Sequence, residues 1–143
     1  VRTRRMLLER FNHVSKTPVV SNAINEQDQE LIDRATAIIR KYFEDIEFDM
    51  NVLAAELGIG RSKLYLRIKE ITGLTPNELT LKIKLEEAMY LITNQPNLNV
   101  SEISYQLGFS SPRYFSKCFK SFYGVSPQNC RKGKNKSEES EED

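Results

Sequence analysis

The sequence has 143 residues, of which 39% are hydrophobic and 29% are charged. A chain of this size forms one domain, or two very small units that share a core, which excludes a large multi-domain enzyme. Its 21 Lys and Arg residues are nearly balanced by 20 Asp and Glu residues, so the formal net charge is +1. Taken as an average, this value is ordinary for a soluble protein and argues against a nucleic-acid binder.

The charges are arranged in opposed blocks, which the average hides. Residues 24–49 hold eight acidic and three basic residues, whereas residues 131–136 hold four basic residues and no acid. Residues 137–143 then add five acids. The balance of charge therefore gives no reason to dismiss a DNA-binding function for individual segments.

Cysteine and histidine are too scarce for most metal and catalytic sites. The chain has two cysteines, Cys118 and Cys130, and one histidine, His13, without a spacing typical of zinc ligands. The sequence also lacks a glycine-rich phosphate loop and any Ser-His-Asp or Cys-His arrangement. We therefore expect no metal, no cofactor, no small-molecule ligand and no enzymatic activity.

The same counts bear on the cellular compartment. The sequence contains no apolar run that approaches the roughly 20 residues needed to span a bilayer. Sparse cysteine suits a reducing environment, so we expect a cytoplasmic location. Because the sequence begins with Val1 rather than Met, we also expect it to be part of a longer chain.

The composition divides the chain into four parts. Residues 1–24 combine a basic arm with a polar linker. Residues 25–44 have apolar residues spaced by three and four, which predicts an amphipathic helix capped by Asn25 with an acidic outer face. Residues 45–132 read as a run of short helices punctuated by glycine and proline, and residues 133–143 as a disordered charged tail.

Capping signals divide residues 45–132 into separate helices. The predicted N-caps are Asp49, Gly60, Thr75, Asn99 and Ser111, and glycines mark most of the helix ends. The predicted helices cover residues 50–57, 61–72 and 76–93, followed by a short helix after Asn99 and a longer one that Gly124 ends. The 76–93 helix is the longest and joins the two halves.

The second half of this region repeats the first. Gly108 stands 50 residues after Gly58, and three inward aliphatic positions of the 61–72 helix recur as phenylalanines 51 residues later. A Gly-Leu-Thr-Pro stretch at 73–76 likewise has its counterpart in Gly-Val-Ser-Pro at 124–127. Two ordered copies of one pattern indicate a duplicated supersecondary unit.

A short helix, a tight glycine turn and a second helix with a basic free face are typical of a helix-turn-helix DNA reader. The second helix buries one stripe, and its other face enters a major groove about 12 Å wide, where Lys, Arg, Ser and Tyr can bond base edges or phosphates. We predict an all-α fold with two tandem helix-turn-helix units. The candidate DNA-binding residues are Arg61, Ser62, Lys63, Tyr65, Leu66 and Lys69 in the first unit and Pro112, Arg113, Ser116, Lys117 and Lys120 in the second.

Several of these residues leave an alternative open. Leu66 could contact a thymine methyl group or pack against a neighbouring helix. The stripe of Phe115, Phe119 and Phe122 favours core packing over stacking on bases, with Cys118 beside it as a small core residue. For the whole chain, the competing interpretation is a helical protein-interaction module in which the acidic 25–44 helix binds a partner and the basic faces are merely solvated.

Residues 45–132 also resemble the DNA-binding domain of the AraC/XylS transcription regulators. The match is densest over Val-Ser-Glu-Ile at 100–103, Leu-Gly-Phe-Ser-Ser-Pro-Arg-Tyr-Phe-Ser-Lys-Cys-Phe-Lys at 107–120 and Phe-Tyr-Gly-Val-Ser-Pro at 122–127. The resemblance implies seven helices and two recognition helices that enter successive major-groove segments about one turn, or 34 Å, apart. It implies base reading by Ser62, Tyr65 and Leu66 in the first unit and by Pro112, Arg113, Ser116 and Lys117 in the second.

By the same resemblance, Arg61, Lys63 and Lys69 would lie nearer the DNA backbone. The sequence departs from the family after its last proline, where Gln-Asn-Cys-Arg at 128–131 replaces the usual tyrosine and predicts a weaker last helix. The expected partners are double-stranded promoter DNA, RNA polymerase for an activator, and a second copy of the chain.

The region before residue 45 is similar to the segment that precedes this domain in Bacteroides-type hybrid two-component regulators. That similarity implies a longer, inner-membrane-anchored chain in which sensor, histidine kinase and receiver domains precede a DNA-binding output domain. None of those domains lies within these 143 residues.

Overall fold

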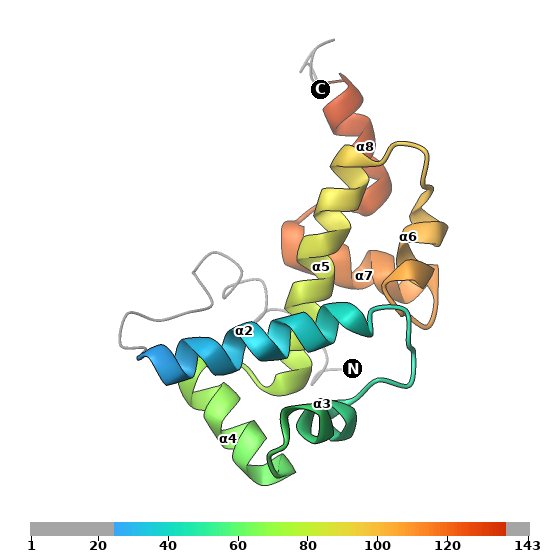
Figure 1. The fold of residues 1–143 in the computed structure, drawn as a ribbon. Coiled ribbons are helices and arrows are strands. Elements are labelled where there is room, and N and C mark those ends of the chain that lie inside the picture. Colours follow the sequence, from blue (N-terminus) through green and yellow to red (C-terminus); the bar gives the residue numbers. More distant parts are fainter. Residues whose placement is uncertain (1–24, 137–143) are drawn as a thin grey trace.

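The computed structural model describes residues 25–136, so the predicted basic arm and linker (1–24) and the acidic run after 136 lie outside the described residues. All regular structure within that range is helical, as predicted, and Figure 1 shows the arrangement. The seven helices of this range are α2 (Glu26–Lys41), α3 (Met50–Leu57), α4 (Arg61–Thr72), α5 (Pro76–Asn94), α6 (Val100–Gln106), α7 (Pro112–Tyr123) and α8 (Pro127–Lys136).

The helices begin where the sequence signals predict. The side chains of Asn25, Asp49, Thr75, Asn99 and Ser111 each accept a hydrogen bond from a backbone N–H in the first turn of the helix that follows. Such caps satisfy backbone donors that have no partner within the helix, and each contributes about 1 kcal/mol. The caps thus fix the residues at which these helices begin.

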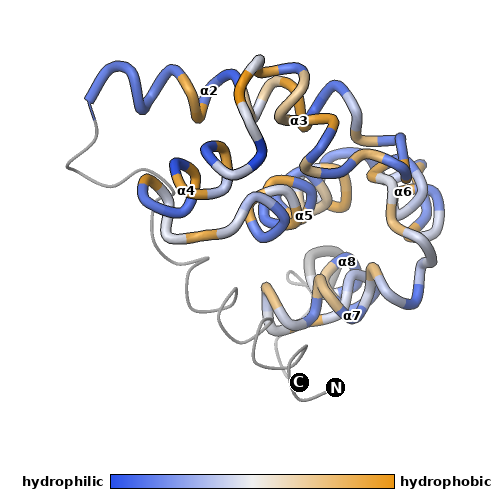
Figure 2. The backbone as a smooth tube through the Cα atoms, turned by 90° about the horizontal axis from the view of Figure 1, so that it is seen from below, coloured by the Kyte–Doolittle hydropathy of each residue, from blue (hydrophilic) through white to orange (hydrophobic). Residues whose placement is uncertain are grey.

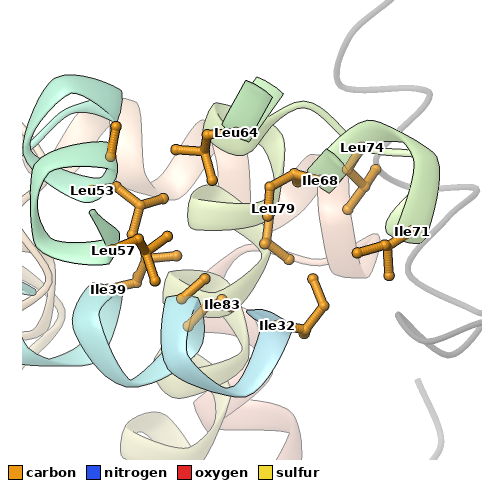
Figure 3. Packing of buried hydrophobic residues seen from close by; sticks show 12 residues of the cluster. Ile32, Ile39, Leu53, Leu57, Leu64, Ile68, Ile71, Leu74, Leu79 and Ile83 are labelled. Atoms are coloured by element: carbon orange, nitrogen blue, oxygen red, sulfur yellow. The ribbon is translucent and has the colours of Figure 1, made fainter. Parts of the chain in front are cut away.

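The first helix-turn-helix unit encloses a hydrophobic core formed by α2, α3, α4 and the first half of α5 (Figure 3). From α4 the predicted stripe of Leu64, Ile68 and Ile71 is buried, and from α2 Ile32 and Ile39 face it. Burial of one such aliphatic side chain stabilises the fold by about 1.5–3 kcal/mol. The division expected between 25–44 and 45–132 therefore falls inside one shared core, because the apolar face of α2 is covered by the first unit.

The second unit has its own core, in which aromatic rings take the place of the aliphatic stripe. Phe115 and Phe119 of α7 are fully buried, with ring centroids 5.8 Å apart, and Cys118 beside them is buried as predicted. Ile103 of α6 and Leu85 of α5 complete the packing around them. The phenylalanine stripe is therefore core, which confirms the interpretation that it does not stack on bases.

Helix α5 joins the two units. Leu79 and Ile83 in its first half belong to the first core, and Leu85, Ala88 and Ile92 in its second half belong to the second. Figure 1 shows α4 against the lower end of α5 and α7 beside its middle, and the view from below in Figure 2 again places α4 and α7 apart with α5 between them. The two candidate recognition helices, α4 and α7, thus belong to separate cores that α5 connects.

Two helix ends differ from the prediction. Helix α2 ends at Lys41, not at residue 44, because Tyr42 leaves the helix and its ring stacks on Phe48 with centroids 5.1 Å apart. Helix α8 extends through residues 133–136, which were expected to belong to the disordered tail. Pro127 opens this helix, since the fixed φ of proline suits the first helical position. Within the described range, no helix is both long enough and apolar enough to cross a bilayer.

Candidate nucleic-acid interface

Helix α4 is held by its buried stripe so that its other face points outward. Arg61, Ser62 and Lys63 in its first turn are exposed, and so are Tyr65 and Leu66 in the second. Lys69, about one turn further along, is half-buried. The predicted first set therefore lies on the solvent side of α4, with its most exposed members in the half of the helix nearest the N-terminus.

A shallow hollow at the start of α4 brings most of this set together. It is lined by Arg61, Ser62, Tyr65 and Leu66 of α4 and by Met50 at the start of α3. Nη1 of Arg61 donates a hydrogen bond to Oδ1 of Asn51, 2.9 Å away, so α3 orients this cation. Lys63 and Lys69 do not line the hollow. Prediction from the sequence did not select Met50 or Asn51, because both lie on the neighbouring helix.

The exposure of Leu66 removes one of its two alternatives. Its side chain is 60% exposed, whereas Leu64, two residues earlier, is fully buried. Leu66 therefore does not pack against a neighbouring helix within the described residues. Contact with a thymine methyl group remains the prediction for this side chain, since an isolated apolar group on a polar face can recognise that methyl in the major groove.

Helix α7 presents an equivalent face. Arg113, Lys117 and Lys120 are exposed at successive turns, while Pro112 and Ser116 are half-buried. A second shallow hollow is lined by Arg113 and Lys117 together with Ser110, Ser111 and Tyr114. The oxygen of Ser111 accepts from the backbone N–H of Tyr114 at 3.1 Å as the N-cap.

Three of the residues around that second hollow were not among the candidates. Ser110 and Tyr114 lie within the motif that carries the family resemblance, and Ser111 was selected only as a cap. Their position next to the start of α7 is the feature of the sequence that could have identified them. Pro112, Ser116 and Lys120, although predicted, do not line this hollow.

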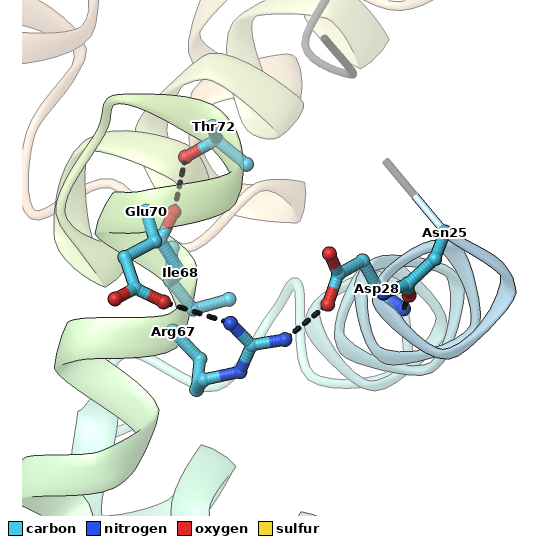
Figure 4. A network of polar contacts seen from close by, with 6 residues as sticks. All are labelled: Asn25, Asp28, Arg67, Ile68, Glu70 and Thr72. Carbon is cyan, nitrogen blue, oxygen red and sulfur yellow. Dashed lines mark hydrogen bonds and ion pairs between the residues drawn. The ribbon is translucent and has the colours of Figure 1, made fainter. Parts of the chain in front are cut away.

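The two faces are almost free of acidic side chains. Helix α7 contains no Asp or Glu, and the one acid of α4, Glu70, accepts a hydrogen bond from Nη1 of Arg67 at 2.7 Å. Arg67 also forms an ion pair with Asp28 on α2 (Figure 4), and these two carboxylates raise the pKa of its guanidinium. The cations that remain on the outer faces can therefore act on a phosphate or a guanine edge.

The long helix α5 contributes cations that are not part of this surface. Nζ of Lys82 is 3.2 Å from Oε2 of Glu86, and the side chain is buried against the ring of Phe122. Burial lowers the pKa of Lys84, whose Nζ lies 5.7 Å from the centroid of Phe109. Both lysines thus lie against aromatic rings of the second core and not on the outer faces of α4 and α7.

The acidic helix α2 is engaged inside the molecule. Asp28 pairs with Arg67, and its buried residues Ile32, Ala35 and Ile39 belong to the first core. The competing interpretation requires this helix as a docking element, but its apolar face is already covered. Only its acidic outer face remains accessible within the described residues.

Comparison with known proteins agrees with this geometry. Residues 53–133 match the family described as "helix-turn-helix domain". The chain is 38% identical over 116 residues to "Histidine kinase P4" of Formosa agariphila, covering 80% of this chain and 8% of that protein. It is 32% identical over 108 residues to the "Msm operon regulatory protein" of Streptococcus mutans, covering 76% of this chain and 38% of that protein. The chain thus spans well under two thirds of either relative.

A solved structure supports the same relationship. The C-terminal domain of AraT, a response regulator from Geobacillus stearothermophilus, is 30% identical and superposes with a TM-score of 0.65. The superposition covers 71% of this chain and 84% of the AraT chain. The similarity therefore extends over most of that C-terminal domain.

Proposed function

Because the chain belongs to the AraC-type helix-turn-helix family of DNA-binding transcription regulators, we propose that it reads a specific DNA site with both of its recognition helices. Helix α4 and helix α7 would enter successive major-groove segments, which corresponds to an asymmetric site of about 16 to 20 base pairs. Such a partner lies in the cytoplasm of a bacterium. A domain that only reads DNA needs no catalytic group of its own.

One observation carries this proposal: the same outward basic face occurs at equivalent places in two units. A single basic helix face is most often a solvated surface, but a duplicated unit has no structural need to keep cations on both copies. On each copy a hollow lies at the start of the second helix of the unit, lined by Arg61 in the first unit and by Arg113 and Lys117 in the second. The N-terminal half is the part of a recognition helix that contacts base edges.

We assign the roles of the side chains by their position. Arg113 and Lys117 would bond guanine edges from α7, and Ser62 and Tyr65 would bond bases from α4, with Leu66 against a thymine methyl group. Pro112 and Ser116 would pack against the same base edges. Arg61, Lys63, Lys69 and Lys120 would bind phosphates and fix the register.

The relatives suggest the wider context. One is named a histidine kinase and the similar solved domain belongs to a response regulator, so we propose that this domain is the output end of a two-component phosphorelay chain that activates transcription. RNA polymerase would be its partner at the promoter. A second copy of the full-length chain would be its partner in signalling.

Selection of DNA from a random pool, followed by binding measurements, tests the function. We expect the selected site to bind at least about 1,000-fold more tightly than random DNA near physiological salt. Affinity for both DNAs should fall as salt rises from about 50 to 200 mM, because phosphate contacts release counterions. Equal affinity for selected and random DNA would overturn the proposal and favour the protein-interaction module.

A further inference from the structure

The segment that follows α2 touches both helix-turn-helix units. Phe43 packs against the cores of the first and the second unit. Just before it, Nη2 of Arg40 lies 2.7 Å from Oε1 of Glu87, in the half of α5 that carries the second core, and the guanidinium lies 5.4 Å from the ring centroid of Phe43. Residues 40–43 are thus a second connection between the units besides α5.

The same segment is tied to the first unit by polar contacts. The hydroxyl of Tyr42 donates to Oε2 of Glu56 on α3 at 2.5 Å, and Nζ of Lys41 lies 3.7 Å from Oε1 of the same carboxylate. The end of α2 is thus bound to Glu56 of α3 and to Glu87 of α5, and it cannot move relative to either without breaking these contacts. Any change in the angle between the units must therefore act against this segment.

The segment also approaches the second unit closely at the turn between α6 and α7. Gly108 has a φ of +77°, and a Cβ placed on it would lie 2.3 Å from the backbone oxygen of Phe43. No real Cβ approaches a backbone oxygen so closely, so only glycine allows the segment to contact this turn. Its counterpart in the first unit, Gly58, has a φ of +74°, and within the described part of the chain no atom beyond its own neighbours lies within 4 Å of such a Cβ.

We propose that residues 40–43 form a brace between the two units, and that Phe43 and Gly108 are positioning residues that set which separation of the two DNA half-sites is accepted. This inference rests on the proposed function. If α5 were the only connection between the two units, they could rotate relative to each other about its axis. The brace adds a contact that lies off the axis of α5. It therefore fixes the rotation of α7 relative to α4 about that axis.

The test uses the selected DNA site and two variants of it, in which one base pair is inserted or removed between the half-sites. One base pair changes the separation by about 3.4 Å and rotates one half-site by about a tenth of a turn. For the unmodified protein we expect an affinity loss of about tenfold or more at either altered spacing, comparable to a mismatched base pair. A protein with loosened units should tolerate the change.

The matched pair of variants is Gly108→Ala and Gly58→Ala. Both place alanine at a positive φ, so both carry the same backbone strain, but only the first forces the brace away. We expect Gly58→Ala to keep the full preference for the original spacing, and Gly108→Ala to reduce it to less than about threefold. A merely structural role of Gly108 would weaken all three DNAs equally and leave their ratio unchanged, and that result would overturn the proposal.

A second variant guards against loss of folding in Gly108→Ala, which circular dichroism would reveal. Arg40→Gln removes the ion pair with Glu87 without touching either turn, and it should reduce the spacing preference by about two- to fivefold. If Arg40→Gln and a folded Gly108→Ala both keep the original ratio, the brace does not exist. If the unmodified protein fails to distinguish selected from random DNA, the proposed function itself is wrong.

Discussion

Asp28 in the first turn of α2 forms an ion pair with Arg67 of α4, on the side of α4 away from the candidate DNA-binding face (Figure 4). Asp28 is fixed in turn, because its backbone N–H donates to Oδ1 of Asn25 at 2.8 Å as part of the cap. The recognition helix is thus supported from behind by a helix that belongs to the same core. Arg67, the basic residue on this side of α4, therefore holds α4 against α2.

Replacement of Arg67 by methionine should lower the stability of the domain and leave DNA recognition intact. Loss of the pair with Asp28 and of the hydrogen bond to Glu70 should cost about 1 to 2 kcal/mol in the free energy of unfolding, since these groups are partly exposed. Glu70→Gln is the matched control, because it removes only the negative charge of the exposed pair within α4 and should cost less than about 0.5 kcal/mol. Urea unfolding measures both values. A reduced salt dependence of DNA binding in Arg67→Met would show that this residue contacts phosphate instead.

Arg131 anchors the last helix, and its replacement should be more damaging. Its guanidinium donates to the carbonyl oxygens of Leu98 at 2.5 Å, Gln95 at 3.1 Å and Ile92 at 3.2 Å, which close the end of α5 and the turn that follows. Arg131→Ala should cost about 2 to 3 kcal/mol, because hydrogen bonds from a charged donor contribute more to stability than neutral ones. Thermal unfolding followed by circular dichroism measures the loss.

Two further variants sharpen that prediction. Arg131→Lys keeps the charge but lacks the planar fork that reaches three carbonyls, so it should recover only part of the stability. Lys132→Ala removes an exposed neighbouring cation and should change stability by less than about 0.5 kcal/mol. Equal effects of Arg131→Ala and Lys132→Ala would contradict the anchoring role.

The local features of the fold were predictable from the sequence, because their causes lie within a few residues. The caps at Asp49 and Thr75 and the buried stripe that begins at Leu64 follow from side-chain type and helical spacing alone. Pairs that join distant segments were not predictable. Arg131, counted from the sequence as part of a basic block, bonds to carbonyls 33 to 39 residues earlier.

The same limit applies to the candidate surface. Periodicity identified which side of α4 and α7 is free, since the opposite side is hydrophobic. It could not show that Leu66 is uncovered, because that depends on where the neighbouring helices lie. Nor could it show that Gly108 faces the oxygen of Phe43, whereas a Cβ on Gly58, at the equivalent place in the first unit, would meet no atom within 4 Å among the described residues beyond its chain neighbours.

Arg113 and Lys120 on α7 should differ in the kind of binding energy they supply. If Arg113 reads a guanine, Arg113→Ala should cost about 1 to 3 kcal/mol on the selected site and relax the preference at one base pair. Lys120→Ala should weaken binding to all sequences alike and reduce the slope of affinity against salt by about one. Titrations with each single-base variant of the site, at several salt concentrations, separate these effects. Identical behaviour of the two variants would refute the distinction.

Leu66 should report on a single methyl group of the DNA. Replacing each thymine of the site in turn by uracil removes that methyl, and at one position we expect a loss of about 0.8 kcal/mol for the unmodified protein. Leu66→Ala should bind thymine and uracil at this position equally, with the stability of the domain unchanged because the side chain is 60% exposed. Leu64→Ala, at a fully buried position, should instead cost about 2 to 5 kcal/mol of stability. Sensitivity to uracil that survives in Leu66→Ala would assign the methyl contact to another residue.

The pair of Tyr42 and Glu56 should make the stability of the domain depend on pH. The hydrogen bond from the Tyr42 hydroxyl lowers the pKa of the Glu56 carboxyl below its ordinary value of 4.5, and it raises the pKa of Tyr42 above 10.0. Because the folded pKa of Glu56 is the lower one, its contribution is complete above the unfolded pKa and disappears as the pH falls through the folded value. For Tyr42 the folded pKa is the higher one. Its contribution to stability is therefore complete below the unfolded pKa of 10.0 and disappears as the pH rises through the folded value.

Tyr42→Phe removes this bond and leaves the ring in place against Phe48. The difference in the free energy of unfolding between the unmodified protein and this variant should be constant from about pH 5 to pH 9 and should shrink below that window. Nuclear magnetic resonance titration should show the pKa of Glu56 rising toward 4.5 in Tyr42→Phe, with a smaller rise in Lys41→Gln, whose ammonium lies 3.7 Å from the carboxylate. An unchanged pKa of Glu56 in Tyr42→Phe would mean that this bond does not hold the end of α2 on α3 in solution. The brace between the units would then lose one of its contacts with the first unit.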